Sequence, residues 1–316
     1  MVVRHTGGPD VIEREDFDLT LPAEGEVLIA QDAIGLNFID TYHPSGLYST
    51  PLPLTLGVEG AGYVESIGPG VDGLAVGDKV GAAGGFGAYA THRTVAADRV
   101  IKITAEISTD EAAAMMLKGM TACFLAEDVL PLRSGQVALV HAAAGGVGSV
   151  LVPWLRDRGV MVIAHSGSAE KAALVEADHS LHCPFTDLAS EVRALTGGNG
   201  VDVVYDGVGK DSWSASLSSL KRRGMMVSYG NASGAVPPIS LLELSRAGSL
   251  FATRPTLFDY IVTREELDHV STRLFDRMQW GVVRAHIGQR YALSDVAAAH
   301  RALEARETVG STILVP

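Results

Sequence analysis

The stretch His141-Ala142-Ala143-Ala144-Gly145-Gly146-Val147-Gly148 determines how the rest of the sequence is interpreted. It follows the short apolar run 137–140 and precedes residues 149–155, whose apolar side chains recur at helical spacing. This order predicts a buried strand, a glycine turn and a helix. Small residues at 143, 145 and 148 match the dinucleotide-binding fingerprint, with alanine in place of its first glycine. We expect backbone amides at the helix N-terminus to bind a pyrophosphate; a tight structural turn without a ligand is the alternative.

The end of the next predicted strand, 160–164, indicates which dinucleotide the fingerprint accepts. Enzymes that select NAD normally carry Asp or Glu at this place, where it binds the ribose hydroxyls. This chain instead has His165-Ser166-Gly167-Ser168, followed by Lys171 one turn into a helix. Hydroxyls and a lysine favour a 2′-phosphate, which a carboxylate would repel, so we expect NADPH, with Ser166 and Lys171 among its ligands. The alternative is that Ser168 caps the helix and Lys171 is a solvated surface residue.

The composition indicates a globular, acidic protein of two domains. The chain has 316 residues, of which 47% are hydrophobic, enough for a sizeable core. Its formal net charge of −12 argues against sequence-independent binding to nucleic acid or to an anionic membrane surface. Residues 1–8 lack the apolar core of a secretory signal and no run of about 18 apolar residues occurs, so we expect a cytoplasmic protein. Cys123 and Cys183 are expected to be free thiols.

Two sequence patterns divide the chain. Residues 1 to about 107 contain short alternating or apolar pieces between Gly and Pro clusters, which predicts a small, turn-rich β domain. Residues 108–111 form a capping box that opens a helix over 112–118, and a second helix is expected through 128. Further on, strands are expected at 137–141, 160–164, 180–182, 201–205 and 225–229, and helices at 186–195 and 211–220. Apolar strands that alternate with helices predict a doubly wound parallel sheet.

The C-terminal part predicts two helices and a strand. Residues 263–266 form another capping box, which opens a helix to about 280, and a further helix is expected over 294–306. The last strand, 311–315, has no helix after it and no partner in the doubly wound sheet, so we expect it to return to the first domain.

Several motifs outside the fingerprint are specific in combination. They are Asn37–Tyr42, Ser45–Tyr48, Leu56–Gly62, Val76–Val80, Lys118–Thr121 and Tyr229–Gly234. Together they resemble the zeta-crystallin-like quinone oxidoreductases, a zinc-independent branch of the medium-chain dehydrogenase/reductase superfamily, over nearly the whole chain. The resemblance implies an α/β fold: a GroES-like β-barrel catalytic domain at 1–115, a Rossmann domain at 116–255, and a segment at 256–316 that returns to the catalytic domain. It also implies NADPH and a homodimer.

The resemblance assigns roles to individual residues. It places Asn37, Tyr42 and Tyr48 beside the nicotinamide and the substrate. The residues that the resemblance and the fingerprint assign to the cofactor are Lys118, Thr121, Ala144, Gly145, Gly146, Val147, Gly148, Ser166, Ser228, Gly230, Asn231, Phe251 and Thr253, with Lys171 and Arg306 on the 2′-phosphate. The chain departs from the bacterial pattern at Cys183, where members of the family often have a tyrosine near the adenosine phosphate.

A metal is not expected in this chain. Zinc enzymes of the superfamily bind the metal through Cys, His and acidic ligands. Asn37 occupies the place of the first cysteine ligand, and the two cysteines cannot form a four-cysteine lobe. The histidines at 43, 92 and 141 are therefore expected to be structural.

The expected reaction is hydride transfer to an activated acceptor. Without a metal or an evident base, alcohol oxidation lacks a group that takes the hydroxyl proton. A quinone accepts hydride more readily, because the anion that forms is delocalised over its ring. Tyr42 or Tyr48 could hydrogen-bond the acceptor oxygen or be ordinary packing tyrosines. Asn37 could orient the cofactor or cap a turn.

Three functions remain open at this point. The first is NADPH-dependent reduction of quinones or related activated carbonyls, and the second is reduction of an enone or enoyl thioester. The third is a non-enzymatic NADPH-binding structural or RNA-binding protein, against which the acidic charge argues. The apolar segment 237–260 is either core or a symmetric subunit contact, and the resemblance favours the contact and hence a homodimer.

Overall fold

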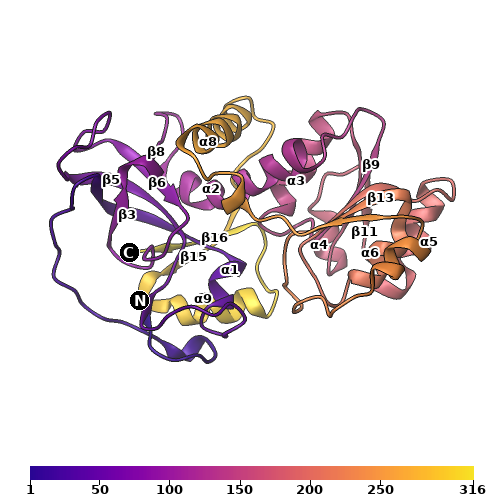
Figure 1. The fold of residues 1–316 in the computed structure, drawn as a ribbon, viewed down its shortest axis with the longest axis horizontal. Helices are drawn as coiled ribbons and strands as arrows, with labels where there is room; N and C mark the ends of the chain where they lie inside the picture. The colour runs from indigo at the N-terminus through magenta and orange to yellow at the C-terminus, as the bar shows by residue number, and fades with distance from the viewer. The chain divides into compact units, whose positions relative to one another are not determined.

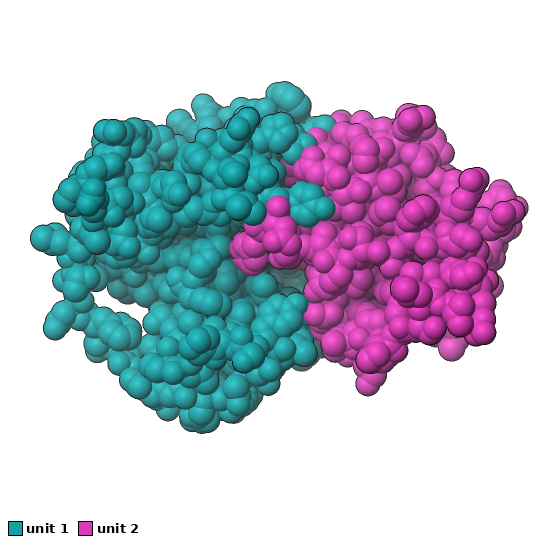
Figure 2. All heavy atoms as spheres, viewed as in Figure 1, with its two compact units in different colours: residues 1–120, 260–316 teal, residues 121–259 magenta.

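The computed structural model describes residues Met1–Pro316, and the chain divides into two units. Unit 1 comprises Met1–Met120 and Tyr260–Pro316, and unit 2 comprises Thr121–Asp259. Figure 2 colours the two units separately.

Unit 2 is built on a six-stranded parallel sheet, which Figure 1 shows with its helices. Its strand order is β11 (His179–Leu181), β10 (Met161–His165), β9 (Val137–His141), β12 (Val201–Asp206), β13 (Leu220–Ser228) and β14 (Phe251–Thr253). Every residue of β12 is buried, including Asp202 and Asp206, and its other four residues are Val or Tyr. In chain order this is the 3-2-1-4-5-6 arrangement of doubly wound dinucleotide-binding sheets. The predicted Rossmann fold is therefore confirmed.

Five helices belong to the strand connections of unit 2. They are α3 (Gly148–Asp157), α4 (Ala169–Ala173), α5 (Phe185–Leu195), α6 (Trp213–Ser219) and α7 (Leu241–Arg246). Leu188 of α5 and Trp213 of α6 pack with Leu139 and Ile163 of the sheet in one buried cluster. The predicted bounds of α6 and β13 were wrong: the helix stops at Ser219 because β13 begins at once, pairing with β12 from Val201 onward across a register shift.

Unit 1 is built mainly on antiparallel strands. Its seven-stranded sheet has the order β15 (Ile287–Ala292), β16 (Ser311–Val315), β3 (Glu26–Leu36), β5 (Glu59–Ile67), β6 (Lys79–Ala83) and β8 (Ile101–Lys102), with β7 (His92–Ala96) also paired to β3. A smaller sheet has the order β2 (Ile12–Glu13), β1 (Val2–Val3) and β4 (Leu54–Thr55). Two register shifts between β3 and β5 bend this pair, and such bulges curve a sheet toward a barrel.

The C-terminal segment completes unit 1. Strand β16 pairs antiparallel with β3, with Leu314 opposite Ile34, and β15 pairs parallel with β16. Helix α9 (Val296–Glu304) packs Val296 and Ala299 into a buried cluster with Leu56. The first domain therefore contains residues from both ends of the sequence.

The expectation of two helices between 112 and 128 is wrong. One helix, α2 (Thr109–Phe124), runs through this stretch and continues as a wider turn over Leu125–Val129. Gly119 does not end it, because the glycine makes room for a neighbour: an added Cβ would overlap Leu274 of α8 (Arg264–Gln279). None of the helices combines the length and the hydropathy that crossing a bilayer requires.

Both predicted capping boxes are confirmed. At the start of α2, the Glu111 carboxylate accepts from the Ser108 amide at 2.9 Å and the Ser108 hydroxyl accepts from the Glu111 amide at 3.2 Å. Thr263 and Glu266 make the same reciprocal pair at the start of α8, at 2.9 and 3.2 Å. These pairs satisfy amides that the first turn of a helix leaves without partners.

Candidate functional site

The fingerprint turn joins β9 to α3, and its geometry is set one residue earlier than expected. Ala142, with φ of 49°, adopts the left-handed conformation, whereas the sequence assigned the tight turn to Ala143. Ala142 is exposed, so its methyl group meets no neighbour there, and the backbone strain of about 1 kcal/mol is tolerated. The Gly145 amide then donates to the Ala142 carbonyl at 2.8 Å. The turn is closed by its own backbone.

The start of α3 offers amide groups that no part of the chain uses. The backbone amides of Gly146, Val147 and Gly148 donate to no other group of the chain, and Gly146 and Val147 are partly exposed. A Cβ on Gly148 would lie 2.5 Å from the Ala142 carbonyl oxygen and 2.7 Å from Ala143 Cα. Only glycine therefore fits at 148. Free amides at a helix N-terminus, backed by the helix dipole, form a site for an anion.

The sheet brings the other predicted cofactor residues of unit 2 to the same edge. His165 at the end of β10 is in register with His141, and Ser228 at the end of β13 is in register with Asp206. Thr253 of β14 is in register with Val227. The carboxyl ends of these strands therefore lie together, and this is the edge at which doubly wound sheets bind ligands.

Ser166 marks the place where the NAD-selecting acid would stand. Its side chain is buried, and its hydroxyl has no hydrogen-bond partner in the protein. Ser168 caps α4, since its hydroxyl accepts from the Lys171 amide at 3.2 Å, so the capping interpretation of Ser168 is confirmed. A buried hydroxyl without a partner is costly unless a ligand or water satisfies it. The Ser166 hydroxyl is thus available to a ligand at the end of β10.

A buried polar network below this edge was not expected from the sequence. The carboxylate of Asp206, fully buried at the end of β12, accepts from the Ser212 hydroxyl at 2.7 Å and the Ser216 hydroxyl at 2.6 Å. It also accepts from the amides of Val208 and Gly209. The signal in the sequence was an acid that ends an apolar strand immediately before a glycine.

Two histidines extend this network to the next strands. His141 Nε2 lies 2.9 Å from the Ser216 hydroxyl, and His141 Nδ1 lies 3.3 Å from His165 Nδ1. His165 Nε2 in turn lies 2.9 Å from the Cys183 carbonyl oxygen. Burial lowers the pKa of His141 to about 4, against a smaller opposing effect of Asp206. The neutral histidines tie the ends of β9, β10 and β12 together beneath the fingerprint turn.

In unit 1, the predicted substrate residues gather around the short helix α1 (Phe38–Tyr42). Asn37 is its N-cap residue, so the capping interpretation of Asn37 is correct as far as its backbone position goes. The Tyr42 ring lies 5.0 Å from that of Tyr48 and 5.7 Å from that of Phe38, measured between centroids. His43 continues the group toward Phe86, with centroids 4.8 Å apart. The structure therefore brings Tyr42 and Tyr48 together within one aromatic cluster, at the helix that Asn37 begins.

Glu59, to which the sequence analysis gave no role, lies beside these residues. Its fully buried carboxylate accepts from the Asn37 side-chain amide at 2.8 Å and forms an ion pair with Lys118 at 3.1 Å. Its other oxygen accepts from the Leu117 amide at 2.6 Å. The signal that could have revealed it is a lone acid among the small residues of Gly57–Gly62. Two predicted site residues, Asn37 and Lys118, thus share one carboxylate.

Asp40 is a second buried carboxyl in the same region. It accepts from the Asn37 amide at 2.8 Å and from the Tyr89 hydroxyl at 3.1 Å, and the Tyr89 hydroxyl also lies 3.0 Å from His300 Nε2. Burial raises the pKa of Asp40 to about 7, although the Asn37 and Tyr89 hydrogen bonds oppose the shift. Burial lowers the pKa of His300 to about 4. Asp40 is therefore a carboxyl that is partly protonated at neutral pH.

The remaining predicted residues belong to different units. Thr121 lies in unit 2, and Arg306 lies in unit 1, exposed and left-handed with φ of 60° just after α9. Lys171, which the resemblance pairs with Arg306, lies in unit 2. No group of three or more His, Cys, Asp or Glu side chains is arranged to hold a metal ion.

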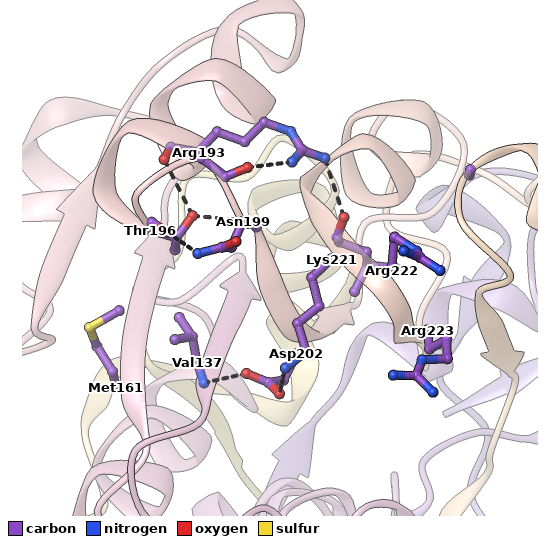
Figure 3. A pocket seen from close by; sticks show the side chains of 13 residues that line it. Val137, Met161, Arg193, Thr196, Asn199, Asp202, Lys221, Arg222 and Arg223 are labelled. Atoms are coloured by element: carbon purple, nitrogen blue, oxygen red, sulfur yellow. Dashed lines mark hydrogen bonds and ion pairs between the residues drawn. The ribbon is translucent and has the colours of Figure 1, made fainter.

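A separate hollow of about 800 Å³ lies at the opposite edge of the unit 2 sheet, where β9 and β10 begin at Val137 and Met161 (Figure 3). It contains none of the predicted site residues. Of its four cations, Lys221 pairs with Asp202 and Arg193 donates to main-chain carbonyls. It is therefore not the candidate catalytic site.

Comparisons with known proteins match both halves of the chain. Residues 23–105 match the family described as alcohol dehydrogenase GroES-like domain, and residues 175–314 match the family described as zinc-binding dehydrogenase. A quinone oxidoreductase of Salmonella typhimurium is 44% identical over 98% of this chain and 97% of that protein. A 2-haloacrylate reductase of a Burkholderia species is 40% identical over 100% of this chain and 98% of that protein.

Solved structures agree with these relatives. The structure of Escherichia coli quinone oxidoreductase complexed with NADPH is similar with a TM-score of 0.96 and 42% identity, covering 100% of this chain and 99% of that chain. A Pseudomonas syringae quinone oxidoreductase is similar with a TM-score of 0.96 and 41% identity, covering 100% and 98% of the two chains. The fold, the sequence identity and its extent confirm the resemblance. This chain belongs to the quinone oxidoreductases, in the zinc-independent branch of the medium-chain dehydrogenase/reductase superfamily.

Proposed function

We propose that this protein is an NADPH-dependent quinone oxidoreductase. The observation that carries the proposal is the carboxyl edge of the unit 2 sheet, where three unused amides begin α3 and the unpartnered Ser166 hydroxyl stands at the position of the NAD-selecting acid. Its relatives of 44% and 42% identity include quinone oxidoreductases, one of them solved with NADPH bound. Bound NADPH supplies the hydride.

The residues present fit this cofactor. The amides of residues 146–148 would hold the pyrophosphate, and Ser166 with Lys171 and Arg306 would hold the 2′-phosphate. Thr121, Ser228, Gly230, Asn231, Phe251 and Thr253 would line the nicotinamide half. A Cβ on Gly230 would overlap the backbone of Gly207, so the two strand ends pack closely beside this half of the site.

Unit 1 supplies groups suited to a flat, electron-poor acceptor. The rings of Phe38, Tyr42 and Tyr48 form an aromatic cluster against which a quinone ring can pack. Hydride addition leaves negative charge on the quinone oxygens. The Lys118 ammonium and the Asn37 amide are hydrogen-bond donors suited to stabilising such an oxyanion, and one proton completes the hydroquinone.

The test is turnover of a panel of quinones. NADPH is mixed with purified protein and simple benzoquinones or naphthoquinones, and the loss of nicotinamide absorbance is followed, with NADH in parallel. We expect turnover of at least one quinone and a preference for NADPH. No turnover on any member of the panel would defeat the proposal.

A second activity is favoured by one observation. The Burkholderia relative at 40% identity reduces a 2-haloacrylate by its name, a carbon–carbon double bond activated by a carboxylate. We therefore include 2-haloacrylates, 2-alkenals and enoyl thioesters in the same assay. A larger kcat/KM for one of these than for every quinone would make this the primary activity.

We also propose that the protein is a homodimer. Strand β14 is the edge strand of the unit 2 sheet, and its Phe251 side chain is 57% exposed. Leu241 and Leu242 of the adjoining helix α7 are 79% and 61% exposed. An unpaired edge beside exposed apolar side chains is a surface that a second copy can cover by symmetric contact.

A further inference from the structure

We propose that Glu59 is a positioning residue for the reduction, because its buried carboxylate holds both the Lys118 ammonium and the Asn37 side-chain amide, the two donors proposed above to stabilise the acceptor oxyanion. This inference rests on the proposed function for the roles of Lys118 and Asn37. It adds a residue that neither the motifs nor the comparisons assign. Glu59 itself contacts neither ligand in this account and acts through its two partners.

The geometry shows three segments converging on one carboxylate. Glu59 begins β5, Asn37 follows β3, and Lys118 lies within α2. Oxygen Oε1 binds both the Asn37 amide, at 2.8 Å, and the Lys118 ammonium, at 3.1 Å. Oxygen Oε2 accepts from the Leu117 amide at 2.6 Å, which fixes the carboxylate against the helix that carries Lys118. Because both partners bind the same oxygen, displacing the carboxylate releases both of them.

Burial makes this arrangement energetically demanding. Glu59 is fully buried and Lys118 is only 6% exposed. A buried ion pair is weak evidence for stability, since apolar side chains of similar volume are often as stable, whereas removing one partner leaves an uncompensated charge. Other ionisable groups nearby include Asp40, whose pKa is influenced by both members of the pair, and Arg93, whose pKa is influenced by Asp40. Fold stability therefore does not explain why the Glu59–Lys118 ion pair is buried here. Its role in orienting Lys118 does.

The packing around Glu59 offers a way to move it without changing any charge. Gly35 faces the carboxylate, and a Cβ on Gly35 would overlap both Glu59 Oε1 and the Ala113 carbonyl oxygen. Gly35→Ala must therefore displace the Glu59 side chain or helix α2. If Glu59 acts by position, this variant reproduces the effect of removing its charge.

The kinetic test is a double-mutant cycle. Glu59→Gln, Lys118→Met and the double variant are assayed with NADPH and the best quinone. We expect Glu59→Gln to lower kcat at least about tenfold while the Kd for NADPH, measured by fluorescence titration, changes less than about threefold. In the Lys118→Met background the same change should cost at least about threefold less, because only the Asn37 amide remains to be held. Equal losses in both backgrounds would overturn the proposal.

A second readout does not depend on turnover. Without its carboxylate partner, the buried Lys118 ammonium is uncompensated, which favours conformations in which the side chain reaches water and the reagent. An amine-reactive reagent followed by mass spectrometry should modify Lys118 at least about fivefold faster in Glu59→Gln than in wild type, with exposed Lys210 as internal reference. An unchanged rate would contradict the proposed hold on Lys118. This measurement stands even if the protein reduces no quinone, which separates failure of this inference from failure of the proposed function.

Two further variants keep the test decisive. Glu65→Gln changes a half-exposed glutamate on the same strand that pairs with His92, and we expect wild-type kinetics and labelling. If Glu59→Gln does not fold, as shown by its unfolding midpoint, Gly35→Ala replaces it in the same assays. A folded Gly35→Ala protein with wild-type kcat and wild-type labelling of Lys118 would overturn the proposal.

Discussion

The most unusual residues of unit 1 are its buried ionisable groups. Asp40, Glu59 and His300 are fully buried, although charged and polar side chains are mostly found at the surface. Each of these three side chains has at least one hydrogen-bond partner, but the individual atoms Asp40 Oδ1 and His300 Nδ1 have none. Buried groups with spare hydrogen-bonding capacity cluster at functional sites more often than in ordinary cores. The pH dependence of stability should report on Asp40 and His300.

Asp40→Asn tests the raised pKa of this carboxyl. The pKa of Asp40 rises from 3.8 to about 7 through burial, so the folded protein keeps the proton over a range in which the unfolded chain loses it. The stabilising contribution is full below about pH 4 and is lost as the pH rises to about 7. As the pH rises from about 4 to about 7, wild type loses this contribution and Asp40→Asn does not. We therefore expect the unfolding free energy of Asp40→Asn, relative to that of wild type, to increase by on the order of 4 kcal/mol over this range, as measured by urea titration. A difference that is independent of pH would contradict the raised pKa.

Lys171→Ala, alone and with Arg306→Ala, tests cofactor selection. If these cations meet the 2′-phosphate, the Kd for NADPH should rise about 10- to 100-fold in the double variant while the Kd for NADH changes less than about threefold. NADH lacks the extra phosphate, which is the physical reason. Fluorescence titration with both cofactors is the measurement, with Lys210→Ala as control. Equal losses for the two cofactors would remove the residues from this role.

At the scale of elements, the β9–turn–α3 unit concentrates the candidate chemistry. The turn uses a left-handed Ala142 and a glycine at 148 to bring the start of α3 against the strand. Beneath it, the Asp206–Ser216–His141 network fixes the strand ends by short hydrogen bonds. A rigid turn keeps its amides oriented before any ligand arrives, which reduces the ordering cost of binding.

Gly148→Val should abolish cofactor binding. Its Cβ would lie 2.5 Å from the Ala142 carbonyl oxygen, so helix and strand must separate and the amides of 146–148 lose their alignment. We expect the Kd for NADPH to rise at least about 100-fold, measured by calorimetry, with the far-ultraviolet circular dichroism retained. Gly8→Ala is the control, since a Cβ there meets nothing within 4 Å. Wild-type affinity in Gly148→Val would exclude this turn as the pyrophosphate site.

At the scale of the whole molecule, a single copy of the chain leaves apolar side chains of α7 and β14 exposed to solvent. Leu241 and Leu242 lie in the turn-bounded helix α7, and Phe251 lies on the edge strand β14. Burying them in a second copy would remove apolar area from water and pair the edge strand.

The double change Leu241→Glu and Leu242→Glu tests the homodimer. Placing carboxylates on both sides of a symmetric contact sets like charges against each other, so we expect a shift from dimer to monomer in sedimentation velocity. Leu174→Glu is a matched control, because Leu174 is also in unit 2 and 62% exposed but lies outside the proposed contact. A wild-type protein that sediments as a monomer, or a variant that remains dimeric, would contradict the proposed contact.

Much of the fold follows from patterns along the chain. The alternation of apolar strands and helices from residue 137 onward is a local signal, and it predicted five strands of the parallel sheet, with ends displaced by only a few residues except at β13. The sixth strand, β14, was not predicted. The glycine at 119 lies inside α2, where it makes room for Leu274, a residue distant in sequence. A glycine in the sequence does not by itself show whether a helix ends there or whether another side chain packs against it.

By itself, the sequence determined the fingerprint turn, the absence of an acid after β10 and the family, because each depends on residue types at short, fixed spacings. Only the tertiary structure decided that Glu59 binds Asn37 and Lys118, which are 22 and 59 positions away in the chain. The same holds for β16, which joins the sheet of β3 near the other end of the sequence. Which side chain meets a buried charge depends on how separate strands and helices pack, and no local spacing encodes that packing.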